Sequence, residues 1–323
     1  MHPSLLPIAC GLMFVAAGGS ILAQTATTGA VSGCPEASAS NTFLGISTIR
    51  LWPGDAPEAK GSGCEDIPTL SVLRPQPGQE NGGAIIVMPG GAYLGLAAIL
   101  EGREVGDWFA ARGFTVFVLR YRLGKKYMLP VPLIDARRAV QLVRARAADY
   151  HLNPSHIGVI GFSAGGNLAG NAETQFVAGK QEAEDPIERV SSRPDFAVLG
   201  YPWIGAISTN TAHLTYCQLM DILKDGPERC EELRKAFSPD LFVTKETPPT
   251  FIYHTTNDET VPVEQGLAMY NALLKAGVSV EIHIFAKGSH SSGLGGGNAA
   301  LDQWPGLLET WLRDQGMLTK SAK

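Results

Sequence analysis

The chain has 323 residues, of which 45% are hydrophobic and 18% charged, and its net charge at pH 7 is −5. A chain of this length can bury the core of one large α/β domain or of two small domains. It contains no long basic run, so the composition argues against a nucleic acid or an anionic membrane surface as a partner.

The N-terminus differs from the rest of the chain. Residues 5–23 are apolar or small, and the polar stretch Gln24-Thr25-Ala26-Thr27-Thr28 follows them. This pattern predicts a secretory signal peptide over residues 1–23, with Ile21-Leu22-Ala23 as the cleavage tripeptide, and a linker over residues 24–45. Residues 1–4 include no Lys or Arg, so an uncleaved signal anchor remains the alternative. We expect a secreted or periplasmic protein without membrane attachment after signal removal.

Four cysteines remain after the predicted signal: Cys34, Cys64, Cys217 and Cys230. An even number of cysteines in an exported chain favours disulfides. Three pairings are possible, and proximity in the sequence favours Cys34–Cys64 and Cys217–Cys230, with buried free thiols as the alternative. The spacings do not resemble those of zinc sites, so we expect no metal.

The main domain is expected over residues 46–320 and belongs to the α/β class. Two early antiparallel strands, 47–53 and 71–74, precede a regular alternation of strands and helices. Continuous apolar runs such as Ala84-Ile85-Ile86-Val87-Met88 are typical of strands buried on both faces of a parallel sheet. Further strands are expected at 115–119, 157–160, 196–201, 250–254 and 278–285, and helices at 101–111, 134–150 and 164–176. The pattern predicts a mostly parallel central sheet with helices on both faces.

One segment interrupts this alternation. About 45 residues between Trp203 and Pro248 show no clear strand. A segment this long in a compact domain is usually functional, so we expect a small helical cap insertion over about 204–247. Simple packing over the sheet is an equal alternative.

The candidate nucleophile lies in Gly161-Phe162-Ser163-Ala164-Gly165, between an apolar strand and a predicted helix. In a G-x-S-x-G turn the serine hydroxyl projects from a sharp bend, and small flanking residues avoid clashes there. The following helix N-terminus can stabilise negative charge. Taken alone, the pentapeptide could also be a purely structural turn.

A serine nucleophile needs a base and an acid that orients the base. The chain order Ser, Asp, His points to Asp258, in the loop after the strand 250–254, and to His290, in the loop after the last strand. Glu259 is the nearest rival to the acid and is expected to be exposed. His254 and His283 fall within strands, where a packed histidine is the better interpretation.

The loop Pro89-Gly90-Gly91-Ala92-Tyr93 follows the first long buried strand, where a second oxyanion loop belongs in such folds. We assign the oxyanion hole to the N–H groups of Gly91, Ala92 and Ala164. A phosphate-binding loop is the alternative use of these glycines, but no Gly-Lys-Ser/Thr follows. The expected chemistry requires neither a metal nor another cofactor.

With these motifs the chain resembles secreted carbohydrate esterases of the α/β-hydrolase superfamily, the acetyl xylan esterase-like or endo-xylanase B-like branch. The resemblance covers about residues 82–315. The motifs that carry it are Pro89-Gly90-Gly91-Ala92-Tyr93, Glu101-Gly102, Tyr121-Arg122-Leu123, Asp135-Ala136-Arg137-Arg138-Ala139-Val140, Gly161-Phe162-Ser163-Ala164-Gly165-Gly166, Pro248-Pro249-Thr250, Asp258 with Val261-Pro262, and Gly288-Ser289-His290. Ala92 departs from the pattern, since a third glycine is common there, and Ser291-Ser292 replace the usual Gly-rich turn.

The resemblance implies a serine esterase that removes acetyl or other small acyl groups from sugars. The leading hypothesis is an exported esterase that acts on O-acylated plant polysaccharides or oligosaccharides, with Tyr93 and Trp203 as substrate contacts. A feruloyl or other bulky-acyl esterase is the first alternative. A catalytically silent binding protein is the alternative from another class, and the sequence does not indicate the oligomeric state.

Overall fold

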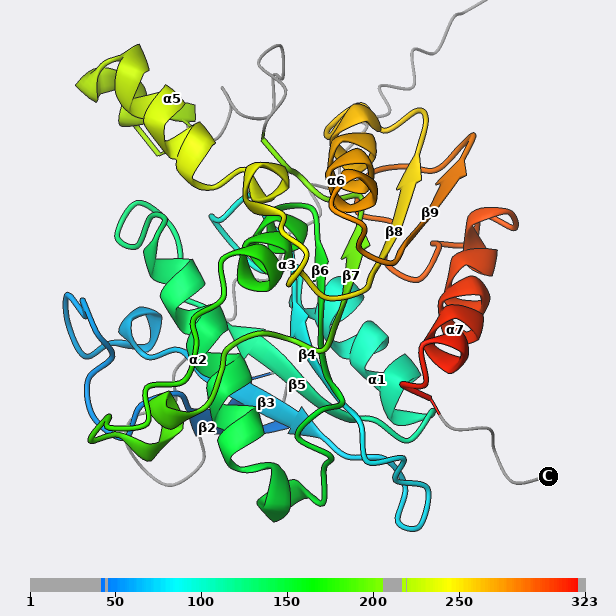
Figure 1. Cartoon of the computed structure of the whole chain (residues 1–323). Helices are drawn as coiled ribbons and strands as arrows, with labels where there is room; N and C mark the ends of the chain where they lie inside the picture. The colour runs from blue at the N-terminus through cyan, green and yellow to red at the C-terminus, as the bar shows by residue number, and fades with distance from the viewer. Residues whose placement is uncertain (1–41, 44–45, 206–216, 219, 319–323) are drawn as a thin grey trace, which may run out of the picture. The chain divides into compact units, whose positions relative to one another are not determined.

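The computed structural model describes residues 42–43, 46–205, 217–218 and 220–318. Within them the strands form a single nine-stranded sheet in the order β1-β2-β3-β5-β4-β6-β7-β8-β9 (Figure 1). The strands are β1 (Thr42–Phe43), β2 (Ile46–Arg50), β3 (Thr69–Leu73), β4 (Ala84–Met88), β5 (Thr115–Arg120), β6 (Ile157–Phe162), β7 (Phe196–Gly200), β8 (Thr250–Thr255) and β9 (Val280–Phe285).

The sheet changes from antiparallel to parallel along its width. β1, β2, β3 and β5 pair antiparallel in succession, whereas every pair from β5 through β4 to β9 is parallel. In β4 all five residues are buried, as the apolar run predicted. The parallel register sets Met88 opposite Gly161, which brings the ends of β4 and β6 together. The predicted mostly parallel sheet is confirmed.

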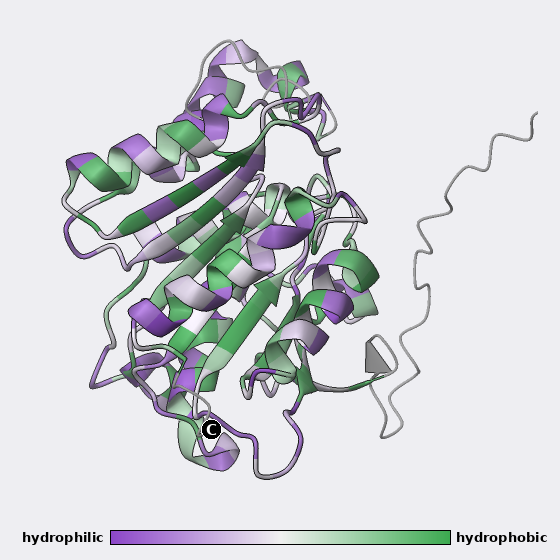
Figure 2. Cartoon of the chain, turned by 90° about the vertical axis from the view of Figure 1, so that its right-hand side faces the viewer, coloured by the Kyte–Doolittle hydropathy of each residue, from purple (hydrophilic) through white to green (hydrophobic). Residues whose placement is uncertain are grey.

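Helices cover both faces of the sheet. They are α1 (Glu104–Ala110), α2 (Val131–Ala145), α3 (Ala164–Thr174), α6 (Glu264–Lys275) and α7 (Trp304–Asp314). A further helix, α5 (Pro227–Ala236), belongs to the segment between β7 and β8 and projects away from the sheet (Figure 1). Side chains of α2, α3 and α6, such as Leu168, pack in one hydrophobic cluster with Ile86, and side chains of α1 and α7, such as Phe109, pack in another with Ile85. Neighbouring residues of one strand thus face opposite layers. Figure 2 shows the apolar strands between these helices.

Short helices complete the chain between these elements. They are η1 (Cys64–Asp66), the π-helix η2 (Ala98–Arg103), η3 (Ala147–Tyr150), η4 (Pro186–Arg189), η5 (Ile222–Asp225), η6 (Pro239–Phe242) and η7 (Leu301–Gln303). The helix expected over 101–111 is therefore divided between η2 and α1. The helix expected over 134–150 begins earlier, at Val131, because Pro132 fits a first helical turn, and η3 follows its end.

The segment between β7 and β8 contains η5, α5 and η6. Cys217 and Cys230 form the predicted disulfide there, with a Cα–Cα distance of 5.9 Å. Residues 206–216 and 219 lie outside the described residues, so the cap insertion over 204–247 stays a prediction.

The N-terminal predictions fall mainly outside the described residues. The signal peptide over 1–23 and Cys34 lie there, so the Cys34–Cys64 pairing also stays a prediction. β1 lies inside the range expected to be a linker, so the sheet begins earlier than expected. No helix in the described part of the chain is long and apolar enough to cross a membrane.

Candidate active site

Ser163 lies between β6 and α3, with a positive φ of 53°. The turn is crowded: a Cβ on Gly161 would lie 2.0 Å from the Gly165 carbonyl oxygen, and one on Gly165 would lie 2.0 Å from the Met88 carbonyl oxygen. Only glycine fits at either position. The strained backbone of a non-glycine residue at such a turn is typical of functional sites.

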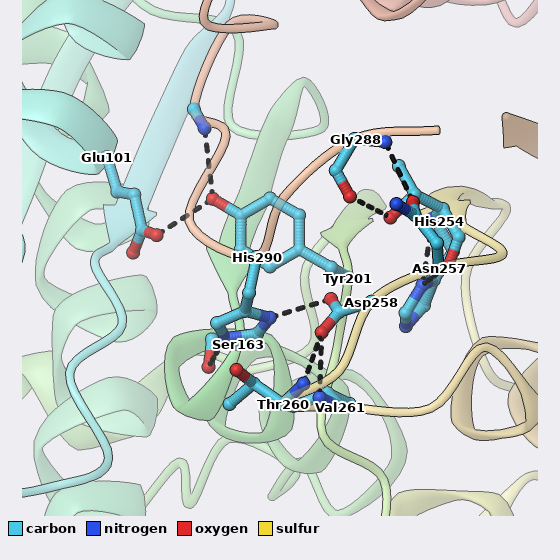
Figure 3. Close-up of polar contacts among 12 residues, drawn as sticks. Glu101, Ser163, Tyr201, His254, Asn257, Asp258, Thr260, Val261, Gly288 and His290 are labelled. Carbon is cyan, nitrogen blue, oxygen red and sulfur yellow. Dashed lines mark hydrogen bonds and ion pairs between the residues drawn. The ribbon is translucent and has the colours of Figure 1, made fainter. Parts of the chain in front are cut away.

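His290 connects the serine to an acid. Its Nε2 lies 2.8 Å from Ser163 Oγ, and its Nδ1 lies 2.7 Å from Asp258 Oδ2 (Figure 3). Because an ionised Asp258 only accepts hydrogen bonds, Nδ1 carries the proton and Nε2 is the acceptor for the serine hydroxyl. The structure thus joins three predicted residues that are far apart in the chain.

Asp258 is held by its own loop. Its Oδ1 accepts hydrogen bonds from the backbone N–H groups of Thr260 (2.9 Å) and Val261 (2.8 Å). Burial alone would raise the pKa of Asp258, but the hydrogen bonds from His290 and from these N–H groups outweigh it, so the pKa lies below its usual value. Asp258 is therefore ionised at neutral pH.

The rival residues do not reach the serine. Glu259 is exposed, as expected. His254 is fully buried in β8, where its Nδ1 accepts the Thr255 N–H at 2.9 Å, and burial lowers the pKa of its imidazole. His283 lies on β9, where its Nε2 is 2.6 Å from Glu281 Oε1.

The loop after β4 offers free backbone donors beside Ser163. Among the described residues, neither Gly91 nor Ala92 donates its N–H to a protein acceptor, and both are exposed. Ala164 is the first residue of α3, so its N–H has no acceptor within the helix. The loop adopts positive φ angles at Gly91 (135°), Ala92 (56°) and Tyr93 (58°). These donors fit the predicted oxyanion hole.

The structure corrects the expectation for the aromatic side chains. Tyr93 is only 1% exposed and Trp203 only 7%. The Tyr93 hydroxyl donates to Asn167 Oδ1 (2.8 Å), and its ring packs edge-on against Trp203, with centroids 6.3 Å apart. Stacking on a substrate requires an exposed ring face, and these two rings lie in the interior instead. They support the oxyanion loop and the start of the segment after β7.

Sequence reasoning missed Glu101 as a member of the site. Glu101 lies in η2 and is 1% exposed, and its carboxylate accepts hydrogen bonds from the Gly90 N–H (2.6 Å) and the Tyr201 hydroxyl (2.8 Å). Burial raises its pKa, and these hydrogen bonds and the His290 charge oppose that rise. The π-helix is a structural sign of a functional segment. One signal is present in the sequence, the Glu101-Gly102 motif of the family resemblance, but that motif assigned no role to Glu101.

No group of three His, Cys, Asp or Glu side chains within the described ranges could hold a metal ion. The arrangement of Ser163, His290 and Asp258 at the carboxyl edge of a mostly parallel sheet defines an α/β-hydrolase. It provides an activated hydroxyl next to free N–H donors.

Comparisons with known proteins agree with this class. The BD-FAE family model matches residues 70–273, and the chain belongs to the BD-FAE family. A crystal structure of an acetyl ester-xyloside bifunctional hydrolase from Caldicellulosiruptor lactoaceticus is similar, with a TM-score of 0.77 and 37% identity, over 84% of this chain and 97% of that chain. The propionate-bound Est2 esterase from Thermogutta terrifontis has a TM-score of 0.66 and 26% identity, over 84% and 97% of the two chains.

Two curated relatives support the carbohydrate esterase resemblance. The acetylxylan esterase of Xylanibacter ruminicola is 30% identical over 240 residues, which are 73% of this chain and 46% of the relative. The endo-1,4-beta-xylanase B of Butyrivibrio fibrisolvens is 31% identical over 231 residues, 68% of this chain and 35% of the relative. The chain spans less than half the length of these two relatives.

Proposed function

We propose that the protein is a serine hydrolase of carboxylic esters. The observation that supports this proposal most directly is the hydrogen-bonded series Ser163 Oγ, His290 and Asp258, with distances of 2.8 and 2.7 Å. In this reaction Ser163 Oγ attacks the ester carbonyl carbon while His290 Nε2 takes its proton. The carbonyl oxygen becomes an oxyanion, which the N–H groups of Gly91, Ala92 and Ala164 stabilise.

The remaining steps return the enzyme to its starting state. Protonated His290 donates its proton to the leaving alcohol as the carbon–oxygen bond breaks, and an acyl-serine remains. His290 then removes a proton from a water molecule, which attacks the acyl carbonyl carbon. The acid leaves, Ser163 Oγ recovers its proton from His290, and no metal or cofactor takes part.

We further propose that the substrate is an acetylated plant polysaccharide or oligosaccharide. The names of relatives that act on acetylxylan or on acetyl esters and xylosides support this substrate class. A bulky aromatic acyl group is the alternative. The buried rings of Tyr93 and Trp203 do not distinguish the two substrates, because they were expected to contact either a sugar or an aromatic acyl group. Initial rates on acetylated xylan and on methyl ferulate separate the two, and faster hydrolysis of the ferulate would reverse the choice.

The location outside the cytoplasm is also a proposal. The apolar stretch 5–23 and the Cys217–Cys230 disulfide support it, since disulfides persist in oxidising compartments. N-terminal sequencing of the protein recovered from the medium or the periplasm tests it. A mature protein that still begins at residue 1 would contradict the predicted signal peptide.

The variant Ser163→Ala tests the nucleophile. We expect hydrolysis of p-nitrophenyl acetate to fall about 10³-fold or more, because the attacking oxygen is lost. Ser155→Ala is the matched control, since Ser155 is exposed and lies on the same chain segment before β6. Retained activity in Ser163→Ala would contradict the assignment. Failure of the wild-type protein to react with a fluorophosphonate would favour a catalytically silent binding protein.

A further inference from the structure

Glu101 is a buried carboxylate beside the candidate active site, and the reaction above does not use it. Its Oε2 accepts the Gly90 N–H at 2.6 Å, and its Oε1 accepts the Tyr201 hydroxyl at 2.8 Å. Both oxygens therefore act as acceptors, which is the pattern of an ionised carboxylate. In the described part of the chain no Lys or Arg forms an ion pair with Glu101. A buried, unpaired carboxylate costs stability, so its presence calls for a functional reason.

The first contact of Glu101 fixes the oxyanion loop. Gly90 is held at both backbone groups, because its N–H donates to Glu101 and its carbonyl oxygen accepts the Ala97 N–H at 2.9 Å. A Cβ on Gly90 would lie 2.8 Å from Glu101 Oε2 and 3.0 Å from Ser163 Cβ, so Gly90 is closely packed against both the carboxylate and the serine. Since the Gly90 N–H is occupied, the N–H groups of the next two residues are left to face a substrate.

The second contact reaches the histidine loop. The Tyr201 hydroxyl donates to Glu101 and accepts the N–H of Gly293, three residues after His290, at 3.1 Å (Figure 3). The Tyr201 ring also packs edge-on against the His290 imidazole, with centroids 5.0 Å apart. One carboxylate is thus connected to both loops that must be placed correctly around Ser163.

We propose that Glu101 is a positioning residue for ester hydrolysis: its carboxylate ties the oxyanion loop to the histidine loop and supplies a second fixed negative charge that faces His290. This inference rests on the proposed function. Asp258 holds one side of the imidazole, and Glu101 acts on the same ring through Tyr201 and through its charge. As His290 takes the serine proton, it becomes the cation that balances the Glu101 carboxylate.

In the part of the chain that the structure describes, the groups that interact electrostatically with Glu101 or His290 are Asp258, His254 and three tyrosines. His254 lies near both His290 and Asp258, and burial lowers its pKa, so it stays neutral. Three tyrosine hydroxyls lie near Glu101, those of Tyr121, Tyr201 and Tyr253. Burial raises the pKa of each, so all three remain protonated. Glu101 and Asp258 are therefore the two negative charges next to the imidazole among these groups.

The variant Glu101→Gln removes the charge and keeps the shape. The amide oxygen can accept only one of the two hydrogen bonds. The NH₂ group would then face the second donor, and two donors cannot form a hydrogen bond with each other. We expect kcat on p-nitrophenyl acetate to fall about 10- to 100-fold, the range for loss of a hydrogen bond to a charged group, with little change in KM. The acidic limb of the kcat/KM profile should move to lower pH, because protonated His290 loses a favourable negative charge. Glu104→Gln, at an exposed position of α1, should change neither quantity.

The variant Tyr201→Phe separates the effect of the hydrogen bonds that join the two loops from the effect of the Glu101 charge. It keeps the ring against His290 and removes the hydroxyl that joins Glu101 to Gly293. We expect kcat to fall while the acidic limb does not move to lower pH, since the Glu101 charge remains. The concentration of active sites is measured by complete labelling with a fluorophosphonate, and each kcat is calculated from that concentration. Misfolded protein in a sample therefore does not lower the kcat.

The outcomes separate this inference from the proposed function. If the wild-type protein and Glu104→Gln hydrolyse the ester but Glu101→Gln has an unchanged acidic limb, or an unchanged or higher kcat, the inference about Glu101 is wrong and the esterase proposal stands. If Glu101→Gln is too unstable to purify, a kcat for Tyr201→Phe equal to that of the wild type overturns the inference. If the wild-type protein neither hydrolyses esters nor is labelled at Ser163, both proposals fail together.

Discussion

Glu173 makes the stability of this protein depend on pH. It lies in α3, is fully buried, and burial raises its pKa from 4.5 to about 8. Thr250 Oγ1 lies 2.8 Å from Glu173 Oε2 and 3.0 Å from the Pro248 carbonyl oxygen, yet a hydroxyl has one hydrogen to donate. A protonated Glu173 resolves this, because it donates to Thr250 and Thr250 then donates to Pro248.

The sign and size of the effect follow from this pKa. Between pH 4.5 and about 8 the folded chain keeps a proton on Glu173 that the unfolded chain releases, so the free energy of unfolding falls as the pH rises. At roughly 1.4 kcal/mol per pH unit, the full loss approaches about 5 kcal/mol, and about 3 kcal/mol of it falls between pH 5.5 and 8. The stabilisation is fully present below pH 4.5 and is lost above about pH 8.

The variant Glu173→Gln tests this value. Its amide can donate to Thr250 as the protonated acid does, and it does not titrate. Between pH 5.5 and 8.5, we expect the free energy of unfolding, measured with urea, to fall by about 3 kcal/mol more in the wild type than in the variant. Glu182→Gln, at an exposed position, should follow the wild type at both pH values. An equal pH dependence in the wild type and Glu173→Gln would refute the reasoning.

Two further predictions concern the disulfide and a buried ion pair. Cys217→Ser with Cys230→Ser opens a loop closed over a sequence separation of 13, and we expect a loss of about 3 kcal/mol in denaturant unfolding. The same change should raise KM for acetylated xylan more than it lowers kcat on p-nitrophenyl acetate; an unchanged KM would contradict a role of this segment in binding. Asp135→Asn leaves the fully buried Arg122, 2.7 Å from Asp135, without its counter-charge, and should cost about 3–5 kcal/mol. Asp107→Asn, in an exposed pair, should cost less than about 1 kcal/mol, and similar losses for both would contradict the role of burial.

Local patterns in the sequence were sufficient for every strand except β1 and for the turn at Ser163. A run such as Ala84–Met88 is apolar at every position because both faces of the strand are covered, and that requirement is visible without a structure. Gly161 and Gly165 are required by contacts within the turn or with the adjacent strand end. Chain order and position in the predicted loops pointed to Asp258 and His290. Each residue follows a strand, and the carboxyl ends of these parallel strands lie at the same edge of the sheet.

The tertiary structure decided everything that depends on contacts between distant segments. The direction of the Tyr93 ring follows from the backbone turn at φ 58° and its bond to Asn167, 74 residues away, and neither has a sequence signal. Glu101 meets Tyr201, 100 residues further on, and Glu173 meets Thr250 at a separation of 77. A glutamate within a helical pattern is usually exposed, and only the packed neighbours that exclude water from these two determine their charge and their partners.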